Sequence, residues 1–288
     1  MVIFYRSTVD TLSDADIVLI GVPDESRSHA KRKGTSRAPD MIRLASNESE
    51  FFKREGRIIP TSPMRGSLAG KKILDLGNVQ RQNLSRLIFD IISHGKLPII
   101  IGGDHSITTI ALSEIGKILG KISLVYFDAH PDFVSSTKNY YGSVMTDSAQ
   151  FIDFKRSLLI GTRAAEAEEL ENAAKVGLEI ISPMEVLELG VLKLARRFSG
   201  KGREKKYISI DLDCLDPAFA PGVSVPSPGG LSSTDLLYLV KQAVHSGIIA
   251  MDIVELSPDF DLNNMTAYLA ARIISESIAS LNKGQSEE

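Results

Sequence analysis

The sequence predicts an α/β fold built on a mostly parallel sheet that is buried on both faces. Short apolar runs rich in β-branched residues recur about eight times, and most are too continuously apolar for a strand with one face in water. Helix-like patterns lie between most of these runs, and this alternation is typical of parallel βαβ units with right-handed crossovers. In chain order the predicted strands are Ile17–Val22, Ile73–Leu76, Pro98–Ile101, Ile122–Phe127, Leu158–Gly161, Leu178–Ile181, Tyr207–Leu212 and Ile248–Leu256.

Helices are predicted where apolar residues recur at intervals of three and four between the strands. In Asn83–Ser93 the pattern begins at an asparagine that can cap a helix and stops before Gly95, which favours a helix end. The remaining predicted helices are Ser106–Leu119, Glu166–Lys175, Pro183–Phe198, Ser232–His245 and Thr266–Leu281.

The chain of 288 residues shows no internal repeat, low-complexity linker or change of composition that would mark a domain boundary. We therefore expect a single domain over residues 1–288, with a polar, frayed tail at 282–288. Hydrophobic residues make up 43% and charged residues 24%, which is typical of a globular protein with a substantial core.

The net charge and the length of the apolar runs limit the binding partners and the cellular compartment that can be expected. The net charge of −3 gives no electrostatic reason to expect binding to nucleic acid or to an anionic membrane. No apolar run approaches the ~18–20 residues that a membrane span needs, and the N-terminus lacks a signal-peptide pattern. A single cysteine, Cys214, allows no disulfide within the chain, so we expect a cytoplasmic protein.

Three clusters of Asp and His follow the ends of predicted strands, at Gly102–His105, Asp128–Asp132 and Asp211–Asp213. Ligands of open α/β sheets collect outside the carboxyl ends of the strands, so we expect the clusters to meet at one edge. A single Asp at such a place could equally cap a helix or close a turn. Buried carboxylates in this number, however, are too costly without a positive charge among them. The three clusters together therefore favour a metal centre.

Spacing and ligand type indicate what the metal centre could do. Residues two apart on an extended strand share a face, so Asp128, His130 and Asp132 can point the same way. Asp211 and Asp213 have the same two-residue spacing and can also share a face. Carboxylate with imidazole suits Mn, Zn, Fe or Ni. Two His and four Asp are too many for one four-coordinate zinc, whereas two ions ~3.5–4 Å apart can activate water and stabilise an oxyanion. The sequence therefore predicts a hydrolytic metalloenzyme.

Two further segments could complete the site. Glu255 follows an apolar strand, where it is either a surface acid or a carboxylate that pairs with a planar cation such as guanidinium. Asp252, on the same strand, is either a partner for a ligand residue or structural. The Pro- and Gly-rich loop 216–230 follows the third cluster. It either walls the site, with Ser224 as its polar contact, or is a rigid connector.

These motifs closely resemble the arginase/agmatinase (ureohydrolase) family, which also includes formiminoglutamases, and agmatinase most of all. The family's hallmarks are Gly-Gly-Asp-His-Ser, Asp-Ala-His-x-Asp, and Asp-x-Asp-x-x-Asp-Pro followed by Gly-Gly-Leu. The resemblance covers nearly the whole chain in the same order. Its matching segments are Gly21–Pro23, Ala38–Arg43, Gly102–Ser106, Asp128–Asp132, Asp211–Pro217, Gly229–Leu231, Met251–Glu255 and Thr266–Arg272.

The resemblance implies a three-layer α/β/α domain on an eight-stranded sheet, with two Mn²⁺ ions. The implied ligands are His105, Asp128, Asp132 and Asp211 for one ion, and Asp128, His130, Asp211 and Asp213 for the other. Asp132 would also orient the attacking hydroxide, and Glu255 would anchor the guanidinium. The implied reaction cleaves a guanidino C–N bond, most simply converting agmatine to urea and putrescine in polyamine biosynthesis. The substrate would be a small cation, and family members form trimers or hexamers.

Two departures from the family pattern bear on activity. Relatives carry a His before a glycine after the second cluster, as a proton shuttle, whereas this chain has Tyr141 before Gly142. A phenol with an ordinary pKa near ~10 is a poor shuttle at neutral pH, and His29 is an alternative. The segment Val223–Val225 replaces a Thr-Gly-Thr-like triplet. The cognate substrate is therefore open among agmatine, arginine, guanidinobutyrate and formimino compounds.

Two other functions compete with the ureohydrolase prediction. A deacetylase-like amide hydrolase would need one zinc, and the Asp211/Asp213 pair together with Glu255 speaks against it. A metal-stabilised protein that binds without turnover would explain the missing shuttle His, although all the implied metal ligands are present.

Overall fold

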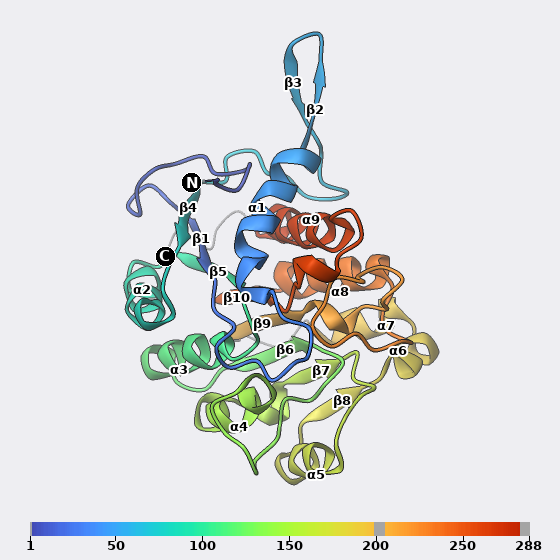
Figure 1. Ribbon diagram of the computed structural model, residues 1–288. Helices are drawn as coiled ribbons and strands as arrows, with labels where there is room; N and C mark the ends of the chain where they lie inside the picture. Colours follow the sequence, from blue (N-terminus) through green and yellow to red (C-terminus); the bar gives the residue numbers. More distant parts are fainter. Residues whose placement is uncertain (1, 199–204, 283–288) are drawn as a thin grey trace.

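The computed structural model describes residues 2–198 and 205–282, and within these an eight-stranded sheet runs through the molecule (Figure 1). Its strand order is β4-β1-β5-β10-β9-β6-β7-β8, and every recorded pairing within it is parallel. Each predicted apolar run became one of these strands. They are β1 Ile17–Val22, β4 Ile73–Asn78, β5 Leu97–Gly102, β6 Ser123–Phe127, β7 Leu158–Ile160, β8 Glu179–Ile181, β9 Lys206–Asp211 and β10 Ala250–Val254.

Helices cover both faces of the sheet, which explains why the strands are apolar throughout. Side chains alternate between the faces of a strand. On β1, Ile17 and Leu19 enter a core that includes side chains of α1, α8 and α9. Val18 and Ile20 enter a second core with side chains of α2 and α3. The predicted three-layer α/β/α fold is confirmed.

The helices mostly follow their predicted bounds. They are α1 Ala38–Ser49, α2 Arg81–Ser93, α3 Ile107–Leu119, α4 Val144–Ser148, α5 Ala167–Val176, α6 Pro183–Leu189, α7 Val191–Ala195, α8 Ser233–His245 and α9 Met265–Ser280. The single helix predicted over Pro183–Phe198 was wrong. Gly190, with φ of 78°, separates α6 from α7 because this left-handed conformation interrupts a helix.

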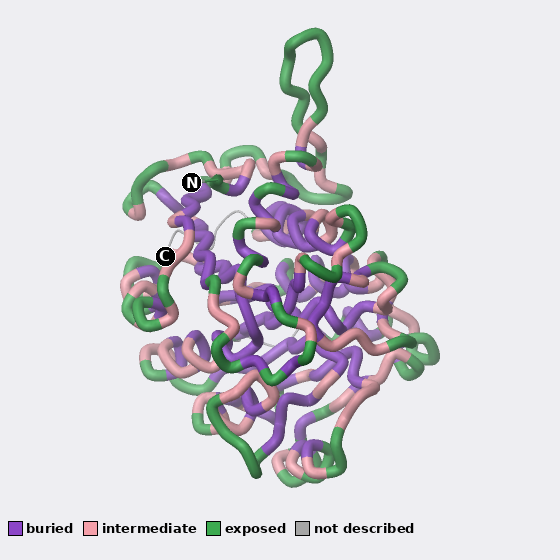
Figure 2. The backbone as a smooth tube through the Cα atoms, in the orientation of Figure 1, coloured by how far each residue is buried: buried purple, intermediate pink, exposed green. Residues whose placement is uncertain are grey.

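The sequence prediction had no counterpart for α1, for the short helix α4 or for an antiparallel hairpin that follows α1. The hairpin consists of β2 Phe51–Arg54 and β3 Arg57–Pro60, and it projects from the body of the molecule (Figure 1). Nearly all of it is exposed, whereas the central sheet is buried (Figure 2).

The sheet draws strands from residue 17 to residue 254. Most of the predicted frayed tail, residues 283–288, lies outside the described residues. None of the helices described is long and apolar enough to cross a membrane.

Candidate metal centre and active site

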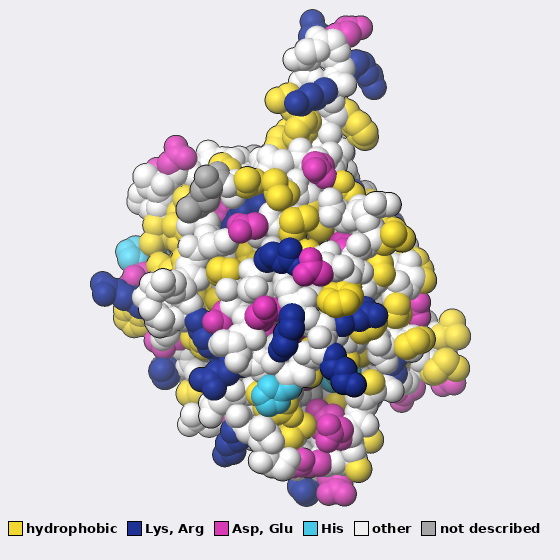
Figure 3. All heavy atoms as spheres, viewed as in Figure 1, with side chains coloured by type: hydrophobic (Ala, Val, Ile, Leu, Met, Phe, Trp, Pro, Cys, Tyr) yellow, Lys and Arg dark blue, Asp and Glu magenta, His cyan; other side chains and the backbone are white. Residues whose placement is uncertain are grey.

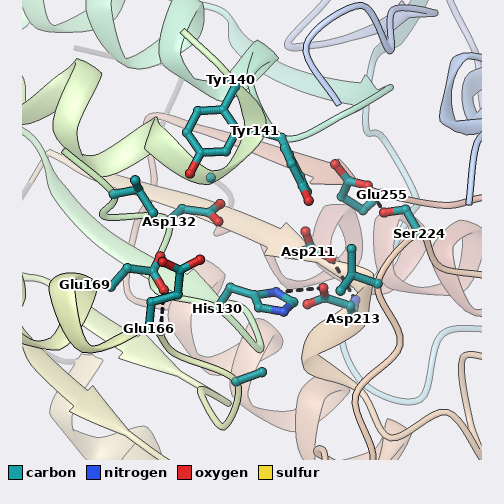
Figure 4. A pocket seen from close by; sticks show the side chains of 14 residues that line it. His130, Asp132, Tyr140, Tyr141, Glu166, Glu169, Asp211, Asp213, Ser224 and Glu255 are labelled. Atoms are coloured by element: carbon teal, nitrogen blue, oxygen red, sulfur yellow. Dashed lines mark hydrogen bonds and ion pairs between the residues drawn. The ribbon is translucent and has the colours of Figure 1, made fainter. Parts of the chain in front are cut away.

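The carboxyl end of the sheet holds a pocket lined by side chains from the second and third of the three predicted clusters (Figure 4). The turn after β5 brings the first of these clusters into place. A Cβ at Gly103 would lie 1.9 Å from the carbonyl oxygen of Asp24, so only glycine permits this close passage of two loops. The chain then turns directly into α3, which leaves His105 at the mouth of the strand.

His105 forms the centre of a first ligand cluster. Its Nδ1 lies 3.1 Å from Oδ2 of Asp128, 3.0 Å from Oδ2 of Asp132 and 3.2 Å from Oδ2 of Asp211. All four side chains are buried. The neighbouring strand order β5-β10-β9-β6 explains how residues far apart in sequence converge here.

His130 forms the centre of a second cluster beside the first. Its Nδ1 lies 3.1 Å from Oδ2 of Asp213 and 3.5 Å from Oδ1 of Asp128. Asp128 therefore presents one oxygen to each imidazole, which is the arrangement expected of a bridging carboxylate. Asp211 turns Oδ2 to His105, while its Oδ1 accepts the backbone N–H of Asp213 at 2.8 Å.

The residues present fit a pair of cations. Among the described residues, His105, Asp128 and Asp132 form one group that could hold a metal ion, and Asp128, His130 and Asp213 form another. Oδ2 of Asp128 is buried with no hydrogen-bond partner. Burial, followed by the charges of Asp132 and Asp213, raises the pKa of Asp128 to about 6. Burial and neighbouring carboxylates also raise the pKa of Asp211. A bound cation would stabilise the ionised forms of both carboxylates and lower these pKa values. Nitrogen and oxygen ligands suit divalent transition metals.

A chain of hydrogen bonds fixes the ring of His105. Nε2 lies 2.9 Å from Oγ of Ser209, which in turn donates to Oδ1 of Asp252 at 2.6 Å. Asp252 also accepts the hydroxyls of Thr108 and Tyr207, each at 2.6 Å. This set of bonds leaves Nδ1 facing the carboxylates. The structure therefore resolves the alternatives for Asp252: it is a buried partner of a residue that holds His105.

Glu255 lies in the pocket, and the surface position that the sequence left open is excluded. It is buried, with Oε1 accepting the backbone N–H of His105 at 2.8 Å and Oε2 accepting the hydroxyl of Ser224. Burial, followed by the charge of Asp104, raises the pKa of Glu255 to about 8. Its φ of 66° is left-handed, as is the φ of 49° at Asp132. Such strain in non-glycine residues is common at functional sites.

The loop after β9 forms one wall of the pocket. This agrees with the first of the two interpretations that the sequence allowed for loop 216–230. Ser224 and Val225 line the cavity. The guanidinium of Arg163 pins this loop by donating to the carbonyl oxygens of Asp213 at 2.8 Å and Leu215 at 3.0 Å. The loop is thus both a rigid connector and a wall.

Tyr141 lines the pocket beside Tyr140, but its surroundings oppose ionisation. Burial, followed by the charges of Glu255 and Asp132, raises the pKa of Tyr141 to about 12. The phenol therefore stays protonated at neutral pH and can donate a hydrogen bond. His29 is an exposed neighbour, with its ring centroid 4.9 Å from that of Tyr140 and 6.2 Å from that of Tyr141. It is not among the residues that line the pocket.

Sequence reasoning missed the acidic wall opposite Glu255, which Figure 4 shows as Glu166 and Glu169. Both belong to the capping box that starts α5. Glu169 accepts the backbone N–H groups of Phe133 at 3.1 Å and Glu166 at 2.9 Å. Burial raises the pKa of Glu169 to about 7. The available signal was their position just beyond the strand β7, because the other predicted site residues also follow strand ends.

Comparisons with known proteins agree with this geometry. The agmatinase of Neisseria gonorrhoeae is 32% identical over 274 residues, which cover 92% of this chain and 86% of that protein. The crystal structure of agmatine ureohydrolase of Thermoplasma volcanium superposes with a TM-score of 0.83 at 30% identity, covering 97% of this chain and 94% of that one. Proclavaminate amidino hydrolase from Streptomyces clavuligerus superposes with a TM-score of 0.82 at 26% identity, covering 97% and 96%.

The matches extend across the sheet and the pocket together. Residues 15–279 fit the model of the arginase family, and this span includes every residue of both ligand clusters and Glu255. The chain therefore belongs to the arginase family, a family of ureohydrolase enzymes.

Proposed function

We propose that the protein is a manganese-dependent agmatinase that cleaves a guanidino C–N bond, releasing urea and putrescine. One observation carries the proposal. Two ligand clusters share Asp128 and face a pocket whose opposite walls each hold a buried carboxylate, Glu255 on one side and Glu169 on the other. This arrangement supports two Mn²⁺ ions beside a small substrate that is cationic at both ends.

The metal pair would supply an activated water and stabilise the charge that develops as water adds to the guanidinium carbon. Glu255 would accept N–H groups of the planar guanidinium, which matches a carboxylate in bidentate geometry. Ser224 holds that carboxylate by donating to Oε2. Binding of a cation would compensate the burial that raises the pKa of Glu255 to about 8.

Proton transfer would fall to Asp132. Its Oδ2 accepts the hydroxyl of Tyr126 at 2.7 Å and lies 3.0 Å from Nδ1 of His105, so its orientation is fixed. Asp132 would take a proton from the attacking water and deliver it to the departing nitrogen. The C–N bond then breaks, and the products are urea and the amine. Tyr141 would donate a hydrogen bond from its neutral phenol.

The far wall supports agmatine over substrates with a carboxylate tail. Glu166 and Glu169 line the pocket opposite Glu255, where they would receive the primary ammonium of agmatine. A carboxylate tail, as in guanidinobutyrate, would meet these acids and be repelled. The protein's setting is proposed to be the cytoplasm, where the one cysteine, buried Cys214, would stay reduced.

Urea release tests the proposal directly. Mn-loaded protein would be assayed with agmatine, arginine and guanidinobutyrate, and formamide release would be followed with formiminoglutamate. Agmatine should give the highest kcat/KM, and Asp128→Ala should abolish the activity. Preference for arginine, guanidinobutyrate or formiminoglutamate would refute the substrate and retain the ureohydrolase chemistry.

A binding role without turnover is the second candidate, because Tyr141 stands in place of a titrating histidine. It would be favoured if protein with two bound metals bound agmatine in calorimetry yet released no urea. A one-zinc amide hydrolase is less well supported, since the described residues include two ligand groups.

A further inference from the structure

The side chain of Arg163, in the segment between β7 and α5, bonds only to the backbone. Basic and acidic side chains are interspersed over the face of the molecule in Figure 3, and the buried Arg43 pairs with the carboxylate of Asp75. Within the described part of the chain, by contrast, the guanidinium of Arg163 forms no ion pair. Every group to which it donates is a carbonyl oxygen, in residue 161, residues 213–215 and residues 227–228.

These three backbone segments surround one half of the candidate metal centre. Arg163 donates to the carbonyl oxygen of Asp213 at 2.8 Å, and Asp213 is a candidate ligand. It also donates from Nε to the carbonyl oxygen of Ser227 at 3.1 Å, in the loop that holds Ser224 against Glu255. A third bond, at 2.9 Å, reaches the carbonyl oxygen of Gly161 just after β7. One side chain therefore joins the wall of the pocket to a ligand turn.

The main chain of Arg163 holds the opposite ligand turn. Its N–H and that of Ala164 both donate to the carbonyl oxygen of Ala129 at 3.0 Å. Ala129 lies between Asp128 and His130, and its own N–H donates to Oδ1 of Asp213 at 3.1 Å. Arg163 thus contacts the 128–130 turn through its backbone and the Asp213 turn through its side chain. Asp128, His130 and Asp213 are the members of one candidate ligand group, which we call the His130 cluster.

We propose that Arg163 is a positioning residue that fixes the spacing between the two turns of the His130 cluster and thereby sets the affinity of this cluster for its ion. The inference rests on the proposed function only for the presence of two ions. Hydrogen-bond partners behind metal ligands orient the ligands, and losing one commonly costs about 10–100-fold in metal affinity. The other group, His105 with Asp128 and Asp132, is the His105 cluster. Among the described residues, Arg163 makes no hydrogen bond to His105 or Asp132, so that cluster should keep its affinity.

The geometry explains why the residue is an arginine. A guanidinium is a planar fork with five N–H donors, whereas a lysine ammonium has three donors at one point and cannot reach three separate segments. The fork also fits closely against the wall loop. A Cβ at Gly230 would lie 2.6 Å from Nη2 of Arg163, so a glycine there leaves room for the guanidinium. Arg163→Lys therefore keeps the charge and removes the fork.

Titration with Mn²⁺, followed by electron paramagnetic resonance, tests the proposal. Wild-type protein with two equivalents should show the signal of a coupled pair of ions. Arg163→Lys should bind the first ion like wild type and the second about tenfold or more weakly, so that the signal of isolated Mn²⁺ dominates. Arg6→Lys is the matched control, because Arg6 also donates to a backbone carbonyl oxygen, that of Thr61 at 2.7 Å, outside both clusters. It should bind both ions like wild type.

Hydrogen exchange of metal-free protein measures the same role without any ion. The neck of the wall loop is closed by bonds from the N–H of Asp216 to the carbonyl oxygen of Leu231 and from the N–H of Leu231 to that of Cys214, each at 3.0 Å. These amides should exchange faster in Arg163→Lys, while those of β1 should exchange as in wild type. Arg163→Gln, which removes the charge as well as the fork, should show the same pattern in both experiments.

Four results would overturn the proposal: both ions weakened equally, a second ion bound as tightly as in wild type, variants that circular dichroism shows to be unfolded, or wild type that binds fewer than two ions. The first and third would give Arg163 a general structural role. Wild type with two ions but no preference for agmatine would refute the proposed substrate alone. An active agmatinase whose Arg163→Lys form keeps both ions would refute this inference alone.

Discussion

Asp128 turns each of its oxygens to a different imidazole, and it stands in both ligand groups. We expect Asp128→Asn to lower bound Mn²⁺ from two ions per chain to at most one, because an amide offers a weaker ligand than a carboxylate. Elemental analysis after gel filtration would measure the stoichiometry. Asp10→Asn, at an exposed carboxylate before β1, should keep both ions. Full occupancy in the Asp128 variant would show that this residue is no bridge.

Tyr141 gives a second expectation at the residue scale. With a pKa of about 12, its phenol does not titrate between about pH 6 and 9. Tyr141→Phe should therefore leave the shape of the pH–rate profile unchanged and lower kcat by less than about tenfold, the worth of one hydrogen bond. A limb of the profile that moves or disappears would show that the phenol does transfer protons.

Replacing Tyr141 with histidine tests whether the lack of a proton shuttle limits the rate. Tyr141→His places a group with an ordinary pKa of about 6.5 at the same position. We expect kcat to rise near neutral pH, with a new titration near that value, and Tyr140→His as the control should not reproduce the gain. An unchanged kcat would mean that proton delivery does not limit the rate.

The positions of site residues could be predicted from the sequence where these residues directly follow a buried strand. The six implied metal ligands and Glu255 follow continuously apolar strands, so their convergence could be read from the sequence. Glu166 and Glu169 also follow a strand, β7, but they were missed because a Glu-rich helix start is ordinarily a solvated cap. Tyr141 was identified by its position, but the rise in its pKa depends on burial beside Glu255 and Asp132, which no local pattern encodes.

At the scale of elements, the register between β9 and β10 positions His105. Ser209 and Asp252 are paired across these strands, which places the serine hydroxyl between the aspartate and the imidazole. Ser209→Ala should weaken metal affinity by about tenfold, because the ring loses the partner that orients it. Competition with a metal indicator would measure this. Ser123→Ala, at a buried serine of β6, should leave the affinity unchanged; equal weakening would mean general loosening of the sheet.

The start of α5 gives a pH dependence. Glu169 has a pKa near 4.5 when unfolded and about 7 when folded, so the folded protein holds the proton more tightly and loses stability as pH rises from 4.5 to 7. In metal-free protein, Glu169→Gln should remove on the order of 1–2 kcal/mol of this loss, less than the full shift allows because pocket water screens the charge. Urea unfolding at both ends of this range would measure it. A destabilisation by the amide that is the same at every pH cancels when the two pH values are compared. If the free energies of unfolding of wild type and Glu169→Gln changed with pH in parallel, Glu169 would not be the group responsible for the pH dependence.

The sequence predicted the buried strands correctly. It did not predict elements whose formation depends on packing or on backbone conformation. Unbroken apolar runs identified all eight sheet strands. Helix α1 has a Pro in its first turn, which could have signalled its start. The β2–β3 hairpin is exposed on both faces and therefore lacks the alternation that marks a half-buried strand. The division at Gly190 depends on a left-handed φ that a helical pattern does not reveal.

For the whole molecule, the candidate ligands join strands in the middle of the sheet, so metal binding and global stability should be linked. Side chains after β5, β6 and β9 crowd buried carboxylates together, and β10 lies between β5 and β9. Without cations these carboxylates repel one another. A ligand at 100 times its Kd stabilises the folded state by about 2.7 kcal/mol, so Mn²⁺ should raise Tm by roughly 5–10 °C over chelator-treated protein.

Differential scanning calorimetry with and without Mn²⁺ would measure this linkage. Asp128→Asn is the internal control, because it removes the carboxylate common to both ligand groups and should lose most of the gain. Its metal-free form should unfold at or above the Tm of metal-free wild type, since one buried charge has been removed. If Mn²⁺ left the wild-type Tm unchanged, the buried carboxylates would be balanced by protons alone. The centre would then not be the metal site that its geometry indicates.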